Sequence, residues 1–307
     1  MSQTPAKILS ASRRTDIPGF YMDWFMERIR MGFFEVKNPY TRMIKTVGVS
    51  KESIHSIVFW SKNYADLIHQ GAGEKLKRLG FNLYFNFTIN SESPLLEPEL
   101  PPLGQRLSQL KALVSLSGPE NIAWRFDPIC FYKTKPDGCE KDNLSDFLII
   151  SKQASELGIQ KCVTSFLDMY PKIHKRLEFL SRQKETTTLY FTEPSPEKKM
   201  QVIQWMEKHL SKLDMQLSLC CEKELFSHLG ADTTVLENAC VDGNLLKMNF
   251  GGTPETRRDY GQRSKQGCKC TRSIDIGSYD EHPCFHNCLF CYAAPDIDNK
   301  IKEGGIQ

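Results

Sequence analysis

Short strand-like runs alternate with longer helical patterns along most of this 307-residue chain. Leucines recur at helical spacing from Leu103 to Leu113, and similar patterns lie at 144–148 and 200–213. Strand, helix, strand repeats are typical of parallel sheets. We therefore predict an α/β fold, a partial or complete parallel (β/α) barrel of the TIM type. The predicted strands are 7–12, 56–60, 82–88, 122–127, 160–166 and 216–220.

The third predicted strand has two different faces. Alternate residues from Phe81 to Ile89 are apolar, whereas those between them, from Asn82 to Asn90, are mostly polar. A parallel strand covered on both sides should be apolar on both. Similar polar positions near other strand ends indicate a barrel lumen that holds a polar ligand, with chemistry at the carboxyl ends of the strands. The alternative is an antiparallel sheet that is wet on one side.

The composition changes after residue 246, where helical periodicity gives way to Gly-, Arg- and Cys-rich sequence. We predict a (β/α) barrel over residues 1–246 and an irregular Cys-rich segment over 247–307. That segment is too short to hold its own core, so we expect it to pack on the barrel through a bound metal.

The chain has a net charge of +3, too small to indicate a nucleic-acid partner by itself. We find no apolar signal region near residue 1 and no run long enough to span a bilayer. We therefore expect a cytoplasmic protein with no membrane partner.

Eleven cysteines stand out in a chain expected in a reducing compartment, where clustered cysteines are more often metal ligands or catalysts than disulfides. Six are scattered beside apolar runs and are interpreted as small hydrophobic residues. These are Cys130, Cys139, Cys162, Cys220, Cys221 and Cys240. The other five, within the last forty residues, are Cys268, Cys270, Cys284, Cys288 and Cys291.

Cys284, Cys288 and Cys291 are separated by three and two residues in PCFHNCLFCYA. Loop cysteines at such spacing can hold one face of an iron-sulfur cubane. Three protein ligands leave one iron open to a substrate or cofactor. We predict a 4Fe-4S cluster here.

This motif, with Phe290 before the last cysteine and Tyr292 after it, resembles the cluster motif of radical S-adenosylmethionine enzymes. The resemblance implies a barrel of that type and S-adenosylmethionine bound at the open iron as the second cofactor. Its cleavage gives a radical that abstracts hydrogen from substrate. The chain departs from those enzymes in one respect, because their motif follows the first barrel strand and this one follows all six predicted strands.

Longer motifs extend the likeness over residues 8–295. They are SRRTDIPGFYMDWFMERI, VKNP, VFWSKN, WRFDPI and CKCTRSIDIGSYDEHPCFHNCLFCYA. On these the chain is similar to the bacterial family DUF1848, whose reaction is not established. WRFDPI alone is also similar to spore photoproduct lyase, which suggests a nucleic-acid repair lyase as a weaker alternative.

Zinc is the alternative metal, since it takes four Cys or mixed Cys and His ligands in a closed site. The same region offers Cys268, Cys270, His282 and His286. If Cys268 or Cys270 is a fourth ligand, the cluster is closed and the usual cleavage of S-adenosylmethionine is excluded. They could instead bind a second metal or support the loop.

Charged residues end several predicted strands and suit an anionic or zwitterionic ligand. An equal alternative is that Arg125 and Asp127 form a buried structural pair. The candidate catalytic residues are Arg14, Asp16, Lys62, Arg125, Asp127 and Glu222. The candidate cofactor-binding residues are Asn63, Asn90, Ser165 and Tyr292.

The leading hypothesis is therefore an iron-sulfur enzyme of the radical S-adenosylmethionine type. Its substrate is a small molecule or modified nucleic acid, and an electron donor such as flavodoxin or ferredoxin is required. The second hypothesis is a barrel with a closed structural zinc or iron-sulfur site and a lumen that binds a ligand without radical chemistry. The first requires the three cysteines to face the carboxyl ends of the barrel strands.

Overall fold

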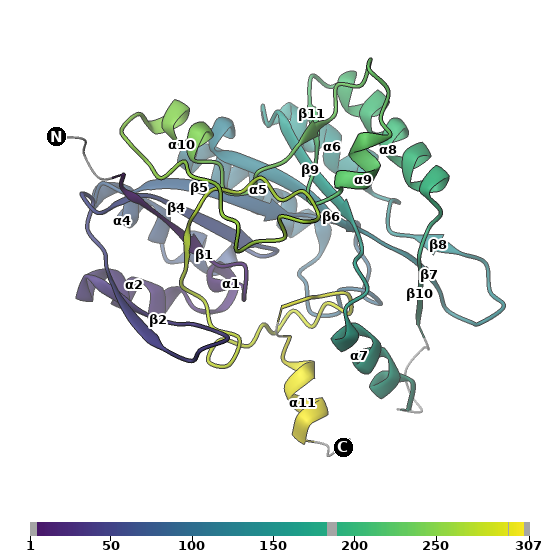
Figure 1. Ribbon diagram of the computed structural model, residues 1–307, viewed down its shortest axis with the longest axis horizontal. Helices are drawn as coiled ribbons and strands as arrows, with labels where there is room; N and C mark the ends of the chain where they lie inside the picture. Colours follow the sequence, from purple (N-terminus) through teal and green to yellow (C-terminus); the bar gives the residue numbers. More distant parts are fainter. Residues whose placement is uncertain (1–4, 183–188, 294, 304–307) are drawn as a thin grey trace.

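A computed structural model of the chain describes residues 5–182, 189–293 and 295–303. The ends of the two predicted regions, 1–4 and 304–307, lie outside this range. The centre of the molecule is an eight-stranded, all-parallel sheet (Figure 1). In spatial order its strands are β12 (Leu236–Glu237), β11 (Gln216–Leu219), β9 (Lys161–Phe166), β6 (Ile122–Ile129), β5 (Asn82–Thr88), β4 (Ile54–Ser61), β1 (Lys7–Ala11) and β13 (Ile274–Asp275).

This sheet confirms the predicted α/β fold, and the antiparallel alternative is wrong. All six predicted strands are present, each within two residues of its predicted bounds. β12 and β13 are the edge strands, so the arrangement is a partial rather than a closed (β/α) barrel. The sequence analysis missed both edge strands, which are two residues long.

Two smaller antiparallel sheets were not predicted from the sequence. One pairs β2 (Phe33–Lys37) with β3 (Ile44–Gly48), directly after a helix that ends at Gly32. Gly32 has a φ of 78°, a left-handed conformation that glycine adopts without steric cost. The other orders β10 (Tyr190–Thr192), β7 (Phe131–Lys133) and β8 (Lys141–Asp142).

Helices connect the parallel strands, as the leucine patterns predicted. The longest, α8, is capped by Ser195, whose hydroxyl accepts the Lys198 amide at 3.3 Å, and it begins with Pro196. The helices are α1 (Ile17–Phe20), α2 (Met22–Met31), α3 (Ala65–His69), α4 (Ala72–Arg78), α5 (Leu103–Ser117), η1 (Pro119–Asn121), α6 (Phe147–Glu156), α7 (Pro171–Arg182), α8 (Pro196–Ser211), α9 (Lys223–Ser227), α10 (Gly243–Phe250) and α11 (Ile297–Glu303).

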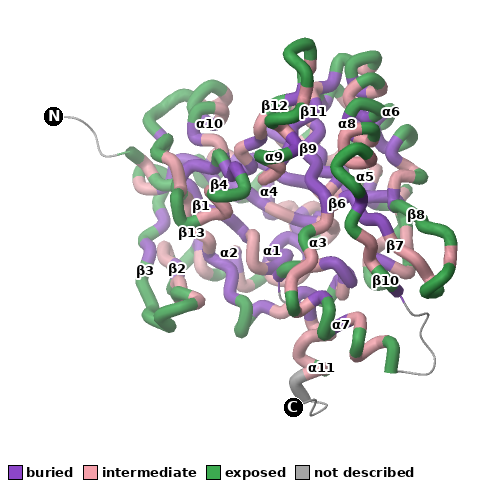
Figure 2. The backbone as a smooth tube through the Cα atoms, turned by 45° about the vertical axis from the view of Figure 1, so that its right-hand side comes forward, coloured by how far each residue is buried: buried purple, intermediate pink, exposed green. Residues whose placement is uncertain are grey.

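The outer face of the sheet carries the main core. The apolar face predicted for β5, from Phe81 to Ile89, is buried there against α2–α6 and α8. Figure 2 shows most of the central strands β4, β6 and β9 buried and many of the outward turns of the helices exposed. None of the described helices is long and apolar enough to cross a membrane.

The inner face of the sheet carries Ile8, Val58, Tyr84, Ala123 and Val163, which pack against α10 and the segment that follows it. Residues 251–273 of that segment cross in front of the sheet from α10 toward β13 (Figure 1). The inner face is therefore a second packed layer. Its polar side chains are covered by other segments of the chain and do not line an open lumen.

Candidate metal centre at the carboxyl edge of the sheet

The three cysteines predicted to hold a cluster lie on one loop, residues 284–291, which we call the cysteine loop. Cys284 and Cys288 are buried and Cys291 is half-buried. Burial raises the pKa of the Cys284 and Cys288 thiols, so a metal bound there would have to displace their protons. Between them, Asn287 has a φ of 51°, a conformation that is uncommon outside glycine and turns the loop.

Arg176 of α7 fixes this loop. The side chain is fully buried and donates to the carbonyl oxygens of Cys288, Leu289 and Cys291 at 3.3, 2.6 and 3.1 Å. It also forms a two-point ion pair with Asp298 of α11, at 2.9 and 3.0 Å. The planar guanidinium can serve several acceptors at once, so one residue sets the path of the backbone around Cys288 and Cys291.

Asp16 joins the end of β1 to both β4 and the cysteine loop. One carboxylate oxygen caps α1 by accepting the Gly19 amide at 2.8 Å. The other accepts the Ser61 hydroxyl at 2.8 Å, the Lys62 amide at 3.0 Å and His286 Nε2 at 2.9 Å. With its lone pairs occupied in this way, Asp16 positions the loop.

Lys62 and Glu97 form a buried ion pair beside Cys288. Burial disfavours the Lys62 ammonium, but the Glu97 carboxylate outweighs this and raises the pKa of Lys62. The Cys288 sulfur lies 3.8 Å from Glu97 Oε1, and Lys62 Nζ lies 5.1 Å from the centre of the Phe290 ring. A charged pair therefore touches the predicted ligand. Lys62 was predicted from the sequence, and Glu97 was not.

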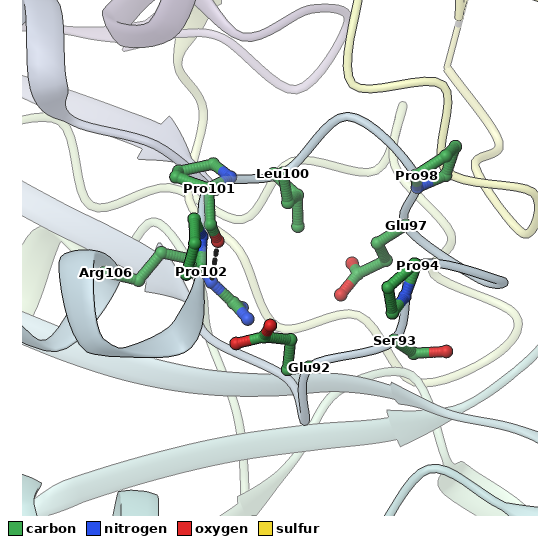
Figure 3. A pocket seen from close by; sticks show the side chains of 9 residues that line it. All are labelled: Glu92, Ser93, Pro94, Glu97, Pro98, Leu100, Pro101, Pro102 and Arg106. Carbon is green, nitrogen blue, oxygen red and sulfur yellow. Dashed lines mark hydrogen bonds between the residues drawn. The ribbon is translucent and has the colours of Figure 1, made fainter.

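Glu97 also lines a cavity of about 60 Å³. Figure 3 shows its carboxylate and that of Glu92 directed into this space, with Arg106 held by the Pro101 carbonyl oxygen at 3.0 Å. The cavity has room for a few water molecules. Its polar lining extends the charged environment of Cys288 toward the surface.

A polar network continues from Glu97 along the carboxyl edge of the sheet. Asn90 contacts Glu97 Oε1 at 3.4 Å and accepts the Asp127 amide at 2.8 Å. The Ser165 hydroxyl donates to the Asp127 carboxylate, and Arg125 forms an ion pair with the same carboxylate at 2.5 Å. Burial disfavours the carboxylate, yet Arg125 and the Ser165 hydroxyl hold the pKa of Asp127 below its usual range. The pairing expected between Arg125 and Asp127 is present.

The remaining predicted residues point elsewhere. Arg14 donates to the Gly277 and Lys37 carbonyl oxygens at 3.1 and 3.4 Å, so it anchors the chain after β13. Asn63 Oδ1 accepts the Gln109 side chain at 2.8 Å and so packs toward α5. Among the described residues, neither forms a hydrogen bond or ion pair with the cysteine loop.

Glu222 and Tyr292 form hydrogen bonds near the ends of two different strands, β9 and β1. Glu222 accepts the Phe166 amide at 2.7 Å, and burial raises its pKa to about 7. The Tyr292 hydroxyl donates to the Arg13 carbonyl oxygen at 2.9 Å, so it ties the end of the cysteine loop to the end of β1. This contact gives Tyr292 a structural role within the chain.

Cys268 and Cys270 do not join the cysteine loop. They pack on the inner face with Cys220, Cys221 and Cys240. Cys220, Cys221 and Cys240 lie in a buried apolar cluster, as predicted for small hydrophobic residues. The sequence did not predict that their sulfur atoms lie close together. Their separate positions in the sequence concealed this grouping.

The side chains of WRFDPI find their partners inside the protein. Trp124 is fully buried, stacks on Phe147 and donates to the Ile89 carbonyl oxygen at 3.0 Å. Arg125 and Asp127 pair with each other. This motif is accounted for by packing, and nothing in these contacts favours a nucleic-acid ligand.

The two histidines near the cysteine loop have different environments. His282 packs against Tyr21 and Trp24, and burial lowers its pKa. His286 lies beside Asp16, and its Nδ1 is buried with no hydrogen-bond partner among the described residues. His286 is therefore the histidine whose free nitrogen suits a metal.

As they stand, no three His, Cys, Asp or Glu side chains of residues 5–182, 189–293 and 295–303 are arranged to hold a metal ion. An iron-sulfur cubane allows its thiolates to lie farther apart than a single metal ion does, because the irons and sulfides of the cluster lie between them. Three thiols on one anchored loop therefore suit a cubane better than a single zinc ion.

These features define a parallel α/β protein with a thiol-rich loop at the carboxyl edge of its sheet. The chain belongs to a family described as a domain of unknown function, DUF1848, whose model matches residues 8–293. No curated protein matches it.

Proposed function

We propose that the protein is an iron-sulfur enzyme of the radical S-adenosylmethionine type, with a 4Fe-4S cluster on Cys284, Cys288 and Cys291. The observation that carries the proposal is the position of the cysteine loop, which faces the carboxyl ends of β1, β4 and β5. Barrel enzymes bind substrates at that edge. When bound, the cluster and S-adenosylmethionine would supply the radical chemistry.

The chain's own residues would hold and tune this centre. Arg176 fixes the loop backbone, and Asp16 orients His286. Lys62 places a positive charge next to Cys288, which offsets the negative charge of thiolate ligands. Cys268 and Cys270 lie on the inner face in a different cluster, and this supports an open iron. The buried Cys130 is the other cysteine that packs in one cluster with Cys288, Leu289 and Phe290.

Cofactor binding requires rearrangement at this edge. A site for a drug-sized ligand has a volume of roughly 300 Å³ or more, whereas the cavity beside Glu97 has about 60 Å³. A cofactor bound beside the cysteine loop would therefore need more room than this cavity provides. Lys62 and Glu97, beside Cys288, are the charged residues that such a cofactor would meet.

The unpartnered Nδ1 of His286 favours a second candidate, a closed structural site in which a histidine completes three cysteines. That site would have no open position. It would not respond to S-adenosylmethionine, so one experiment separates the two.

The test is electron paramagnetic resonance of the reduced protein, reconstituted anaerobically with iron and sulfide, with and without S-adenosylmethionine. We expect a cluster signal that shifts when the cofactor is added. The shift should disappear in Cys288→Ala and persist in Cys139→Ala, which changes an exposed cysteine. A cluster signal indifferent to the cofactor, or zinc in place of iron, would rule out the radical enzyme.

A further inference from the structure

Five cysteines from three separate segments meet on the inner face of the sheet. Cys220 and Cys221 follow β11, Cys240 follows β12, and Cys268 and Cys270 precede β13. The sulfur of Cys220 lies 3.4 Å from that of Cys240 and 3.8 Å from that of Cys221. Cys268 and Cys270 pack in the same buried cluster as these three. We call the five residues the five-cysteine group.

The backbone is shaped to bring these thiols together. Cys221 has a φ of 62°, which few residues other than glycine adopt, and the turn places its thiol beside that of its neighbour Cys220. Thr271 donates its amide to the Val241 carbonyl oxygen at 2.9 Å, which holds the segment with Cys268 and Cys270 against Cys240. The segment that follows β12 is thus joined to the segment that precedes β13.

Nitrogen donors surround the sulfur atoms. Arg125 Nη1 lies 2.8 Å and Asn238 Nδ2 lies 2.9 Å from the Cys240 sulfur, and the Val241 amide lies 3.5 Å from the Cys270 sulfur. Hydrogen bonds and positive charge stabilise thiolates and the sulfur ligands of metal clusters. A group packed only as hydrophobic residues would not need them.

Unpartnered polar atoms border the same group. The described residues contain seven buried side-chain nitrogen or oxygen atoms without a hydrogen-bond partner, and five belong to side chains that contact or flank it. Leaving a buried polar atom unpaired is unfavourable. Three of the five are N–H donors, and their concentration here points to a ligand that accepts hydrogen bonds. The five atoms are Arg13 Nη2, Trp60 Nε1, Asn86 Oδ1, Asn238 Oδ1 and Arg258 Nε.

We propose that the five-cysteine group holds a second iron-sulfur cluster, with four of the five thiols as ligands. An all-thiolate set is soft and selects iron-sulfur clusters, zinc or Cu(I). The thiols do not converge on a point that would hold one ion, whereas a cluster places its own irons and sulfides between them. Its sulfides would accept hydrogen bonds from Arg13, Trp60 and Arg258.

This second centre goes beyond the proposed function and does not depend on it. The cysteine loop supplies none of its ligands. The cluster would tie the ends of β11 and β12 to the segment before β13, at the opposite edge of the sheet. It would therefore stabilise the open side of the partial barrel.

The experiment counts iron and sulfide in the full chain after anaerobic reconstitution. A triple variant, Cys284→Ala with Cys288→Ala and Cys291→Ala, removes the cysteine loop's thiols. We expect it to retain about four irons and four sulfides per chain. We expect a double variant, Cys240→Ala with Cys270→Ala, to lose about four irons and keep the signal that responds to S-adenosylmethionine. Cys162→Ala, a buried cysteine of the outer core, is the matched control.

Two results would overturn the proposal: a triple variant without iron and sulfide, or one that binds zinc without sulfide. Circular dichroism of every metal-free variant identifies misfolding. Should the double variant fail to fold, the triple variant still decides the question. If the triple variant keeps its cluster while the wild type ignores S-adenosylmethionine, the second centre stands and the radical function fails.

Discussion

The cysteine loop and the five-cysteine group present thiols in opposite ways. The loop places three within eight consecutive residues and depends on Arg176 to hold their backbone. The group collects five from three segments that lie up to fifty residues apart and depends on sheet order to bring them together. Local spacing therefore produces the first site, and the tertiary fold produces the second.

The surroundings of the two sites differ in charge as well. At the cysteine loop the thiols lie close to carboxylates, with Asp16 near Cys284 and Glu97 near Cys288. At the five-cysteine group the nearest charged partner is the Arg125 guanidinium. Positive charge stabilises thiolates, so Arg125 favours the thiolate of Cys240. At the cysteine loop, Lys62 has the same effect on Cys288 and offsets the nearby carboxylates.

A chain of polar contacts connects the two sites. It runs from Cys288 through Glu97 and Asn90 to Asp127, and then through Arg125 to Cys240. Each link is 3.8 Å or shorter. Arg125 therefore links this chain of contacts to the five-cysteine group.

Arg176→Met should have the largest effect and should act on the cysteine loop alone. It leaves three buried carbonyl oxygens and the Asp298 carboxylate without their partner. We expect a loss of about 3 kcal/mol in the free energy of unfolding of the metal-free chain, measured with urea. Reconstituted protein should lose the loop's iron and keep that of the five-cysteine group.

Lys175→Met is the matched control, because Lys175 is exposed on the same helix. It should leave stability and iron content unchanged. If Arg176→Met costs less than about 1 kcal/mol, or if both sites lose iron together, the two regions are not independently held.

Asp127→Asn should have an intermediate effect and should break the polar chain between the regions. The variant leaves Arg125 buried without its anionic partner, so we expect a loss of about 2 kcal/mol at neutral pH. The folded-state pKa of Asp127 lies below its unfolded value of about 3.9. Its stabilisation is therefore present above that pH and is lost as the pH falls through the folded value.

Urea unfolding across this acidic range checks the sign. The difference between wild type and Asp127→Asn should narrow as the pH falls below about 4. Asp137→Asn, in an exposed loop, should show no such narrowing. A difference that stays constant with pH would mean that the carboxylate's charge contributes nothing.

The sequence was sufficient for the parallel sheet because its signals are local. The alternation from Phe81 to Ile89 marks the outer face of β5, and all five of its apolar residues are buried in one core. The two-residue edge strands carry no such periodicity. They exist because neighbouring strands provide hydrogen-bond partners, which no short window of sequence records.

The residues of the candidate site differ in how far their positions could be predicted from the sequence. Asp16, Lys62 and Asp127 follow predicted strands, so their place at the carboxyl edge could be inferred. Glu97 lies on a loop nine residues past β5, and Arg176 occupies one turn of an amphipathic helix. Their roles depend on how those elements fold back over the sheet. The five-cysteine group likewise requires knowledge of where residues 251–273 cross.

Tyr292→Phe should have the smallest effect and tests where the two regions meet. The Tyr292 hydroxyl bonds the carbonyl oxygen of Arg13, whose guanidinium borders the five-cysteine group. The side chain is 46% exposed, so water replaces part of the lost bond, and we expect a loss of about 0.5 kcal/mol by urea unfolding. Tyr260→Phe, 71% exposed, is the control and should cost nothing measurable. A loss above about 2 kcal/mol for Tyr292→Phe would mean that the two regions stabilise each other through this contact. The cysteine loop and the five-cysteine group would then not be held independently.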